Sequence, residues 1–196
     1  MLIGTASSLA FAALSLIAAQ QGIFALDRSA QGLVALTRRV PLEDSMETVS
    51  LLGHASLLVP LIALASLFAW RHNRRWALAL PGVMAGAGAL QFLAKWAVDR
   101  PRPNAAPWGY PSGHALIVVV FFGVIAYLIV TSRIRRRWRW TGAVLCVAMM
   151  LAVGWSRLYL DMHWLSDVGG GFAVGLAYLP LAIWLVELRP ARSARQ

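Results

Sequence analysis

Long apolar runs separated by short polar gaps dominate this chain of 196 residues. Each run is close to the roughly 20 residues that a helix needs to cross the hydrocarbon core of a bilayer. We therefore predict an all-α integral membrane protein, a single domain over residues 1–196, in which six transmembrane helices form a bundle. The predicted spans are about 2–26, 49–70, 76–98, 113–131, 141–160 and 164–187.

The segment between the first two spans, residues 27–46, is too polar to cross a membrane. We expect it to contain an interfacial helix on the outer leaflet. The apolar side chains expected to face lipid there are Leu33, Val34, Leu36 and Val40. The first apolar run follows Met1 without a basic residue before it and is longer than the core of a signal peptide, so we expect a retained helix.

Composition excludes most soluble classes of protein. Hydrophobic residues make up 59% of the chain and charged residues 13%, and the mean hydropathy is +0.65. A soluble domain carries about 25% charged residues. The net charge of +10 raises the question of nucleic-acid binding. Because the basic residues lie in short gaps between apolar runs rather than on one soluble face, we predict no nucleic-acid partner.

The distribution of charge predicts the orientation of the bundle. If six helices alternate with both termini in the cytoplasm, the inner segments hold these basic residues: Arg71, Arg74, Arg75, Arg133, Arg135, Arg136, Arg137, Arg139, Arg189, Arg192 and Arg195. The outer segments hold seven basic residues and seven of the eight acidic ones, so they are nearly neutral. The positive-inside rule then predicts cytoplasmic termini. Basic inner loops without an organelle signal favour a bacterial inner membrane.

The outer charges gather at the ends of three predicted spans. Residues 95–103 close the third span, residues 110–114 open the fourth, and residues 156–167 connect the fifth to the sixth. Alternation of the spans places all three segments at one membrane face. We therefore expect them to form a single site, facing the periplasm.

The basic residues of these segments suit a phosphate group. Lys95, Arg102 and Arg157 lie close to the apolar boundary, where a charge is costly unless it has a function. Arginine can bind phosphate oxygens in a bidentate manner. Ser112 and Gly113 come where a helix begins, so its free N–H groups add to an anion site.

Two histidines and one acid complete the predicted chemistry. His163 and Asp167 are four residues apart and share a helix face, so the carboxylate can orient the imidazole and leave its other nitrogen free to attack. His114 comes from a different helix and can protonate a leaving oxygen. This set predicts phosphoryl transfer without a metal. Cys146 is the only cysteine, no Cys/His cluster has the spacing of a zinc site, and no carboxylate cluster accompanies Asp167, so we expect no metal and no cofactor.

At these residues the chain resembles the type-2 phosphatidic acid phosphatases, lipid phosphate phosphatases that share their site with vanadium haloperoxidases. The resemblance runs from about Lys95 to Gly175. The three ordered motifs that carry it are Lys95 with Arg102-Pro103 after six residues, Pro111-Ser112-Gly113-His114, and Ser156-Arg157 followed by His163 and Asp167.

The resemblance implies a role for each matched residue. His163 attacks phosphorus to form a phosphohistidine, Asp167 orients it, and His114 protonates the leaving group. The residues implied to hold the phosphate are Lys95, Arg102, Ser112, Gly113 and Arg157. The implied substrate is a membrane lipid phosphate or diphosphate, with undecaprenyl diphosphate, phosphatidylglycerol phosphate and phosphatidic acid as candidates.

The chain also departs from the family pattern. The connection over residues 104–110 is short, and Arg100 adds a second Arg-Pro two residues before Arg102. The spacing favours Arg102 as the phosphate ligand, with Arg100 as a candidate substrate contact that assists it. Asp161 stands where relatives often carry glycine, and it would either weaken phosphate binding or contact a substrate hydroxyl. Ser156 either packs locally or contacts substrate. Trp108 and Tyr110 are candidate substrate contacts, with an aromatic belt at the interface as the simpler reading of the tryptophan.

Two alternatives stay open at this point. A haloperoxidase would use the same residues for vanadate, but those enzymes are soluble. A non-enzymatic protein that binds or transports a lipid phosphate would need the cations but not a nucleophile. His54 and His72 have no charged partner at a useful spacing, so we assign them no chemical role. The oligomeric state is not predicted.

Overall fold

The computed structural model describes residues 2–20, 22–98 and 100–188, and every regular element in these ranges is helical. In chain order the elements are α1 (Leu2–Ala19), α2 (Ala25–Thr37), α3 (Val40–Ser50), the 3-10 helix η1 (Leu51–Gly53), α4 (Ala55–Trp70), α5 (Arg74–Ala97), α6 (Gly113–Thr131), α7 (Arg136–Tyr159) and α8 (Leu165–Leu188).

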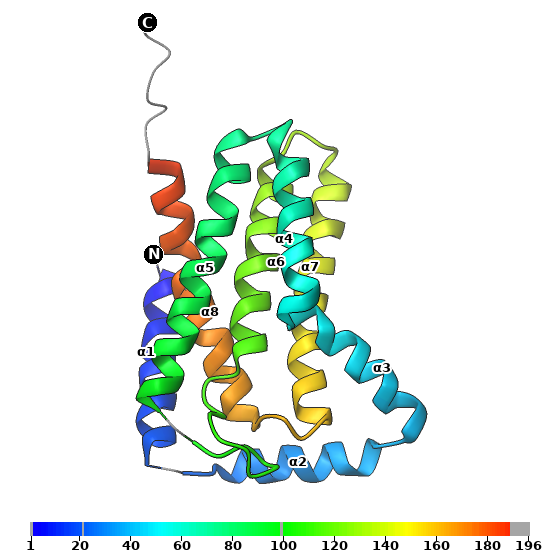
Figure 1. The fold of residues 1–196 in the computed structure, drawn as a ribbon, viewed down its shortest axis with the longest axis vertical. Coiled ribbons are helices and arrows are strands. Elements are labelled where there is room, and N and C mark those ends of the chain that lie inside the picture. Colours follow the sequence, from blue (N-terminus) through cyan, green and yellow to red (C-terminus); the bar gives the residue numbers. More distant parts are fainter. Residues whose placement is uncertain (1, 21, 99, 189–196) are drawn as a thin grey trace, which may run out of the picture.

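Helices α4 to α8 run along the long axis of a bundle in which α6 is central (Figure 1). Its window of highest hydropathy, which averages 2.6, is 56% buried inside the protein, against 33% for α5, α7 and α8. It packs against both α7 and α8. The main core lies between α6 and its neighbours, around Trp76, Leu116 and Val120.

Two glycines of α8 allow it to approach α6 closely. A Cβ atom on Gly171 would lie 2.5 Å from the carbonyl oxygen of Ser112, and one on Gly175 would lie 2.9 Å from Val119. Small residues spaced by four are a common means of close helix packing in membranes. This packing brings the start of α6 against the start of α8, where the Ser112 N–H donates to the Asp167 carbonyl at 2.9 Å.

The all-helical class of fold is confirmed, with four to five candidate spans. Helices α5, α6, α7 and α8 are each long and apolar enough to cross a membrane. The end of α3 with η1 and α4 forms a fifth candidate, bent by 52°. Helix α1 is apolar but shorter than the other candidates. Six spans and cytoplasmic termini stay predictions.

Two predictions at the N-terminal side differ from the structure. The first helix ends at Ala19 instead of continuing to residue 26, and the segment 27–46, predicted to contain one interfacial helix, belongs to two helices, α2 and α3. A proline in the first turn of α3 explains the break, because proline cannot continue a preceding helix. Val34 is buried against the protein instead of facing lipid, whereas Leu33 and Leu36 are 65% and 82% exposed.

The predicted span over residues 49–70 contains a bend that hydropathy does not detect. Helix α4 begins only at Ala55, after η1 and an extended residue, His54, whose ring accepts a hydrogen bond from the Ser56 N–H. Gly53 lies so close to His114 that a Cβ atom would come within 2.7 Å of the ring. The remaining spans agree with prediction to within a few residues, and α6 has the predicted bounds.

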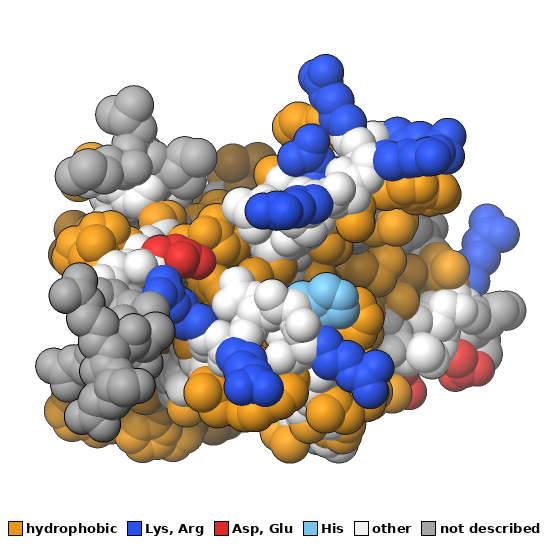
Figure 2. Space-filling model, turned by 90° about the horizontal axis from the view of Figure 1, so that it is seen from above, with side chains coloured by type: hydrophobic (Ala, Val, Ile, Leu, Met, Phe, Trp, Pro, Cys, Tyr) orange, Lys and Arg blue, Asp and Glu red, His pale blue; other side chains and the backbone are white. Residues whose placement is uncertain are grey.

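The two ends of the bundle differ in charge. The α5–α6 loop, the α7–α8 loop and α2 lie at one end, and the α4–α5 and α6–α7 turns lie at the other (Figure 1). Figure 2 looks onto the second end, where blue side chains of basic residues are spread over the surface. The sequence places Arg71, Arg74 and Arg75 in one of these turns and Arg133 and Arg135 in the other.

Candidate active site

A polar cavity of about 330 Å³ lies at the end of the bundle that carries the α5–α6 and α7–α8 loops. Five elements and two loops contribute to its wall. The residues that line it are Ser50, Leu51, His54, Gln91, Lys95, Arg102, Gly113, His114, Arg157, Met162 and His163. The fold thus brings together side chains from each of the three sequence segments that were predicted to form one site.

The wall of the polar cavity is cationic. Lys95, Arg102 and Arg157 line it, and no Asp or Glu stands among the described residues that do so. Buried donors without a partner are costly, and native proteins seldom leave them unsatisfied. Within residues 2–20, 22–98 and 100–188, seven buried side-chain atoms lack a hydrogen-bond partner, and two of them are the Nε atoms of Arg102 and Arg157, which line the cavity. These two free donors favour an anion as the ligand.

His163 lies in the α7–α8 loop and is 2% exposed. Its Nδ1 atom faces Asp167 Oδ2 at 3.6 Å, which is longer than a hydrogen bond but leaves no room for another group between them. Burial lowers the pKa of His163 to about 4, against an opposing effect of Asp167, and Lys95 and Arg157 lower the pKa further. The imidazole is therefore neutral at physiological pH, as a nucleophile must be.

Asp167 is fixed by the way α8 begins. Its Oδ2 atom accepts a hydrogen bond from the Trp164 N–H at 2.8 Å, which is the contact of an acidic residue in the first turn with the N-cap backbone. Its Oδ1 atom accepts from Arg100 Nη1 at 2.9 Å. The carboxylate is fully buried and does not line the cavity, and His163 stands between it and the cavity wall.

His114 stands in the first turn of α6 and lines the same cavity as His163. It is half-buried, and its ring centroid lies 6.3 Å from that of His54. Gly113, the residue before it, packs against Gln91 so closely that a Cβ atom would come within 2.4 Å of that side chain. The N–H groups of this first turn have no partner within the helix, so they add donors beside the cavity.

Two predicted phosphate ligands, Ser112 and Lys95, differ from the others in their contacts with the protein. Ser112 is fully buried and does not line the cavity, although its Oγ atom has no hydrogen-bond partner among the described residues. Lys95 lines the cavity and donates from Nζ to the carbonyl oxygen of Trp108. This contact ties the α5–α6 loop to α5 and fixes the ammonium group at the wall.

The five candidate substrate contacts do not line the polar cavity. Ser156 is buried and donates to the Val153 carbonyl, so it packs within α7. Tyr110 is buried, where its hydroxyl contacts Ser15 and burial raises its pKa to about 12. Trp108 is 46% exposed, and its carbonyl oxygen accepts the hydrogen bond from Lys95.

Arg100 and Asp161 are also drawn away from the cavity. Arg100 is 1% exposed and pairs with both Asp27 and Asp167. Of the two arginines that precede a proline, Arg102 lines the cavity and Arg100 does not. Asp161 pairs with Arg38 and accepts a hydrogen bond from Gln31, so it fastens the α7–α8 loop to α2. Proximity in sequence to the motif residues was therefore a poor guide to contact with the cavity.

Sequence reasoning missed five residues that line the cavity, one of which is the apolar Leu51. Ser50 accepts a hydrogen bond from Arg157, and Gln91 is a polar side chain within the apolar helix α5. His54 lines the cavity although it has no charged partner in sequence, and Met162 precedes His163. Only Gln91 gave a sequence signal, because a lone amide in an apolar run is uncommon.

Comparison with known proteins places this geometry in a family. Residues 76–191 match the PAP2 superfamily. The chain belongs to the PAP2 superfamily. A phosphatidylglycerophosphatase B of Bacillus subtilis is 31% identical to it over 160 residues, which cover 76% of this chain and 78% of that relative. An undecaprenyl-diphosphatase of Sulfolobus acidocaldarius is 29% identical over 114 residues, which cover 58% of this chain and 50% of that relative.

A solved structure supports the PAP2 assignment over the whole fold. The crystal structure of a transmembrane PAP2-type phosphatidylglycerolphosphate phosphatase from Bacillus subtilis superposes with a TM-score of 0.86 and 25% sequence identity. The match covers 98% of this chain and 100% of that one. The resemblance inferred from the three motifs is confirmed, and the chain is a membrane lipid phosphatase.

Proposed function

We propose that this PAP2 protein hydrolyses the phosphate of a membrane lipid phosphate or diphosphate through a covalent phosphohistidine at His163. The observation that carries the proposal is a neutral, buried histidine backed by a carboxylate and facing a cavity whose wall is cationic. Because Nδ1 faces Asp167, the attacking atom is Nε2. Attack forms the N–P bond and breaks the bond from phosphorus to the lipid oxygen. The negative charge of the bound phosphate favours the protonated form of His114, which donates its proton to that oxygen as it leaves.

The second half of the reaction restores the enzyme. His114, now neutral, takes a proton from a water molecule, whose oxygen attacks phosphorus and breaks the N–P bond. Inorganic phosphate leaves, and Asp167 stabilises the positive charge that His163 carries while it is phosphorylated. Lys95, Arg102 and Arg157 stabilise the negative charge that develops on the phosphoryl oxygens in both transition states.

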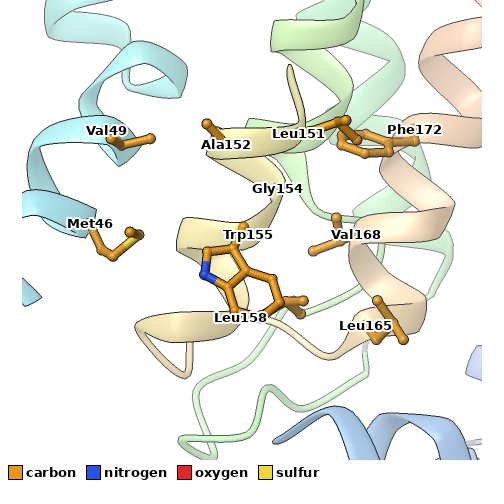
Figure 3. A pocket seen from close by; sticks show the side chains of 10 residues that line it. All are labelled: Met46, Val49, Leu151, Ala152, Gly154, Trp155, Leu158, Leu165, Val168 and Phe172. Carbon is orange, nitrogen blue, oxygen red and sulfur yellow. The ribbon is translucent and has the colours of Figure 1, made fainter. Parts of the chain in front are cut away.

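An apolar cavity beside the polar one supports a lipid substrate. It has a volume of about 500 Å³ and lies between α3, α7 and α8 (Figure 3), with a lining of Met46, Val49, Leu151, Ala152, Gly154, Trp155, Leu158, Leu165, Val168 and Phe172. Val49 and Leu158 line it, whereas the adjacent residues Ser50 and Arg157 line the polar cavity and bond to each other. A lipid with its phosphate in the polar cavity can therefore place a tail here.

The proposed orientation puts the polar cavity at the periplasmic face of a bacterial inner membrane. The basic turns lie at the opposite end of the bundle from the cavity, as the positive-inside rule requires of a cytoplasmic end. With α1 counted as a span, six helices return the chain to the cytoplasmic side. Undecaprenyl diphosphate, phosphatidylglycerol phosphate and phosphatidic acid are the candidate substrates, and the names of the relatives support the first two.

Release of inorganic phosphate by the purified protein in detergent tests this function. The assay uses the three candidate lipids with EDTA present, and compares wild type with His163→Ala. His72→Ala is the matched control, because His72 lies at the opposite end of the bundle, where its ring hydrogen-bonds to the Phe68 carbonyl group and stacks on the Phe68 ring. We expect metal-independent release that is lost in His163→Ala alone. Full activity in His163→Ala would refute the phosphohistidine.

A further inference from the structure

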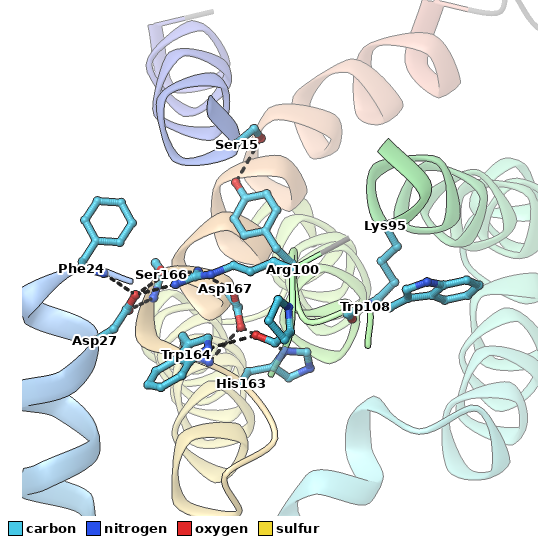
Figure 4. A network of polar contacts seen from close by, with 12 residues as sticks. Ser15, Phe24, Asp27, Lys95, Arg100, Trp108, His163, Trp164, Ser166 and Asp167 are labelled. Atoms are coloured by element: carbon cyan, nitrogen blue, oxygen red, sulfur yellow. Dashed lines mark hydrogen bonds and ion pairs between the residues drawn. The ribbon is translucent and has the colours of Figure 1, made fainter. Parts of the chain in front are cut away.

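Three charged side chains that do not line the polar cavity are buried next to His163. Asp27 comes from α2, Arg100 from the α5–α6 loop and Asp167 from α8, and each is at most 1% exposed (Figure 4). We call these three residues the buried charge cluster. Asp27 lies more than 60 residues before the first motif, and nothing in the sequence pattern marks it.

One guanidinium group bridges the two carboxylates of this cluster. Arg100 Nη1 donates to Asp167 Oδ1 at 2.9 Å, and Arg100 Nη2 donates to Asp27 Oδ2 at 2.9 Å. Ser166 joins them, because its hydroxyl accepts from Arg100 and donates to Asp27, and its N–H donates to Asp27 Oδ1 at 2.8 Å. Asp27 thus also satisfies a free N–H at the start of α8.

The cluster determines which oxygen of Asp167 faces the nucleophile. Arg100 holds Oδ1, so Oδ2 is left for the Trp164 N–H and for His163 Nδ1. With separate partners on its two oxygens, the carboxylate cannot rotate without breaking a charge-assisted hydrogen bond. The direction in which the imidazole presents Nε2 therefore depends on Arg100.

Stability alone explains this arrangement poorly. A buried ion pair seldom stabilises a protein more than apolar residues of the same volume would, because desolvation offsets the attraction. Its position beside His163 offers a better reason. Arg100 alone would neutralise Asp167, whereas a guanidinium shared with Asp27 leaves Asp167 with enough negative charge to stabilise a positively charged imidazole.

We propose that Arg100 and Asp27 are positioning residues for the reaction: Arg100 orients Asp167 toward His163, and Asp27 holds Arg100 and limits how far it neutralises Asp167. This inference rests on the proposed function for the role of His163 as the nucleophile. The other charged or titratable groups around His163 among the described residues are those that line the polar cavity: His54, Lys95, Arg102, His114 and Arg157. They are left unchanged in the experiment below.

Histidine NMR of the full-length protein in detergent tests the proposal without relying on turnover. Ring ¹⁵N and ¹³C signals of the four histidines are followed from pH 7 to pH 3.5, and His163→Ala assigns the signal of His163. The variants are Arg100→Gln, Arg100→Lys and Asp27→Asn. Arg38→Gln is the matched control. Like Arg100, Arg38 forms an ion pair between separate elements, in its case from the end of α2 to Asp161 in the α7–α8 loop, but it does not contact Asp167.

Substitution of the cation and substitution of the anion should shift the pKa of His163 in opposite directions. Loss of a cation in Arg100→Gln favours the protonated imidazole and raises the pKa of His163 by about one unit. Loss of an anion in Asp27→Asn lowers that pKa. Arg100→Lys keeps the charge but cannot bridge two carboxylates, so we expect the wild-type pKa with a reduced fraction of the Nδ1–H tautomer. Arg38→Gln should match wild type in both respects.

Phosphate release is measured on the same samples to separate this proposal from the proposed function. We expect kcat to fall about 100-fold in Arg100→Gln through misplacement of the nucleophile, with KM within twofold of wild type. If the two variants shift the pKa of His163 in opposite directions but wild type releases no phosphate, the role of the cluster is supported and the proposed function is refuted. A His163 with the same pKa and tautomer in all variants would overturn the inference, and if Arg100→Gln does not fold, Arg100→Lys and Asp27→Asn decide it.

Discussion

The two ends of the bundle use arginine in different ways. At the end with the α4–α5 and α6–α7 turns, arginines such as Arg133 are exposed, and Arg75 pairs with Glu187 while both side chains stay more than one-third exposed. At the other end, Arg100 and Arg157 are buried, and Arg157 has a donor without a partner. The same residue type is thus exposed at one end of the bundle and buried around the polar cavity at the other.

The difference lies in what satisfies the charge. At the basic end, Glu187 accepts hydrogen bonds from Trp76 at 2.8 Å and from Tyr127 at 3.1 Å. It also pairs with Arg75, so the charge of that arginine is balanced within the protein. The polar cavity instead has cations and no lining carboxylate among the described residues. A buried cation without a paired acid indicates a site for an anionic ligand, and an exposed one does not.

The sharpest test of this comparison removes the nucleophile. We expect His163→Ala to lower kcat by about 10⁴-fold, in line with the loss of a central member of a catalytic group. Trapping of acid-labile ³²P on the protein from labelled substrate should disappear as well. Labelling that persists in His163→Ala would show that another residue carries the phosphoryl group.

The next test exchanges one arginine at each end. Arg157→Gln should lower kcat about 100- to 1000-fold, because a donor to the developing phosphoryl charge is lost. Arg133→Gln removes the same charge at the exposed end and should leave initial rates within about twofold of wild type. Equal losses in both variants would mean that overall charge, rather than the cavity, governs the reaction.

Stability should separate the buried and exposed ion pairs. Asp27→Asn breaks a pair that is at most 1% exposed and should lower the free energy of unfolding by about 3 kcal/mol. Arg75→Gln breaks a partly exposed pair and should cost less than about 1 kcal/mol. Thermal unfolding in detergent measures both, and a larger effect of Arg75→Gln would contradict the comparison.

The smallest effect on kcat/KM is expected from lowering the pH from 7 to 5. The pKa of His163 is lowered to about 4, so the imidazole stays neutral from pH 7 to pH 5 and becomes protonated only as the pH falls through that value. We expect the acidic limb of kcat/KM to lie near pH 4, with little change between pH 5 and pH 7 attributable to this group. An acidic limb near the ordinary histidine value of 6.5 would show that His163 is not the group that must be neutral.

The catalytic set was readable from local spacing, and its surroundings were not. His163 and Asp167 are four apart, and Ser112 and Gly113 stand at the start of an apolar run, so short-range patterns located them. Their partners come from far along the chain: Ser50 meets Arg157, and Asp27 meets Arg100. Pairs separated by more than 70 residues leave no periodic signal, because only folding brings them together.

The bend before α4 shows the same limit. Residues 49–70 are apolar enough to predict one span, but an extended His54 breaks the helix and brings Leu51 and His54 to the cavity wall. Beside the bend, Gly53 of η1 packs against His114 of α6, which lies far from it in the sequence. Hydropathy reports the average environment of a segment and cannot report such a contact.

By itself, the sequence determined the class of this protein and its family, and it predicted the residues of the site, because hydropathy, charge and motif spacing are local properties of the chain. Tertiary structure alone decided that Arg102 faces the cavity while Arg100 is buried behind Asp167. The two arginines are two residues apart and chemically identical. Their different environments come from α2, whose Asp27 reaches Arg100 and gives it a buried carboxylate partner.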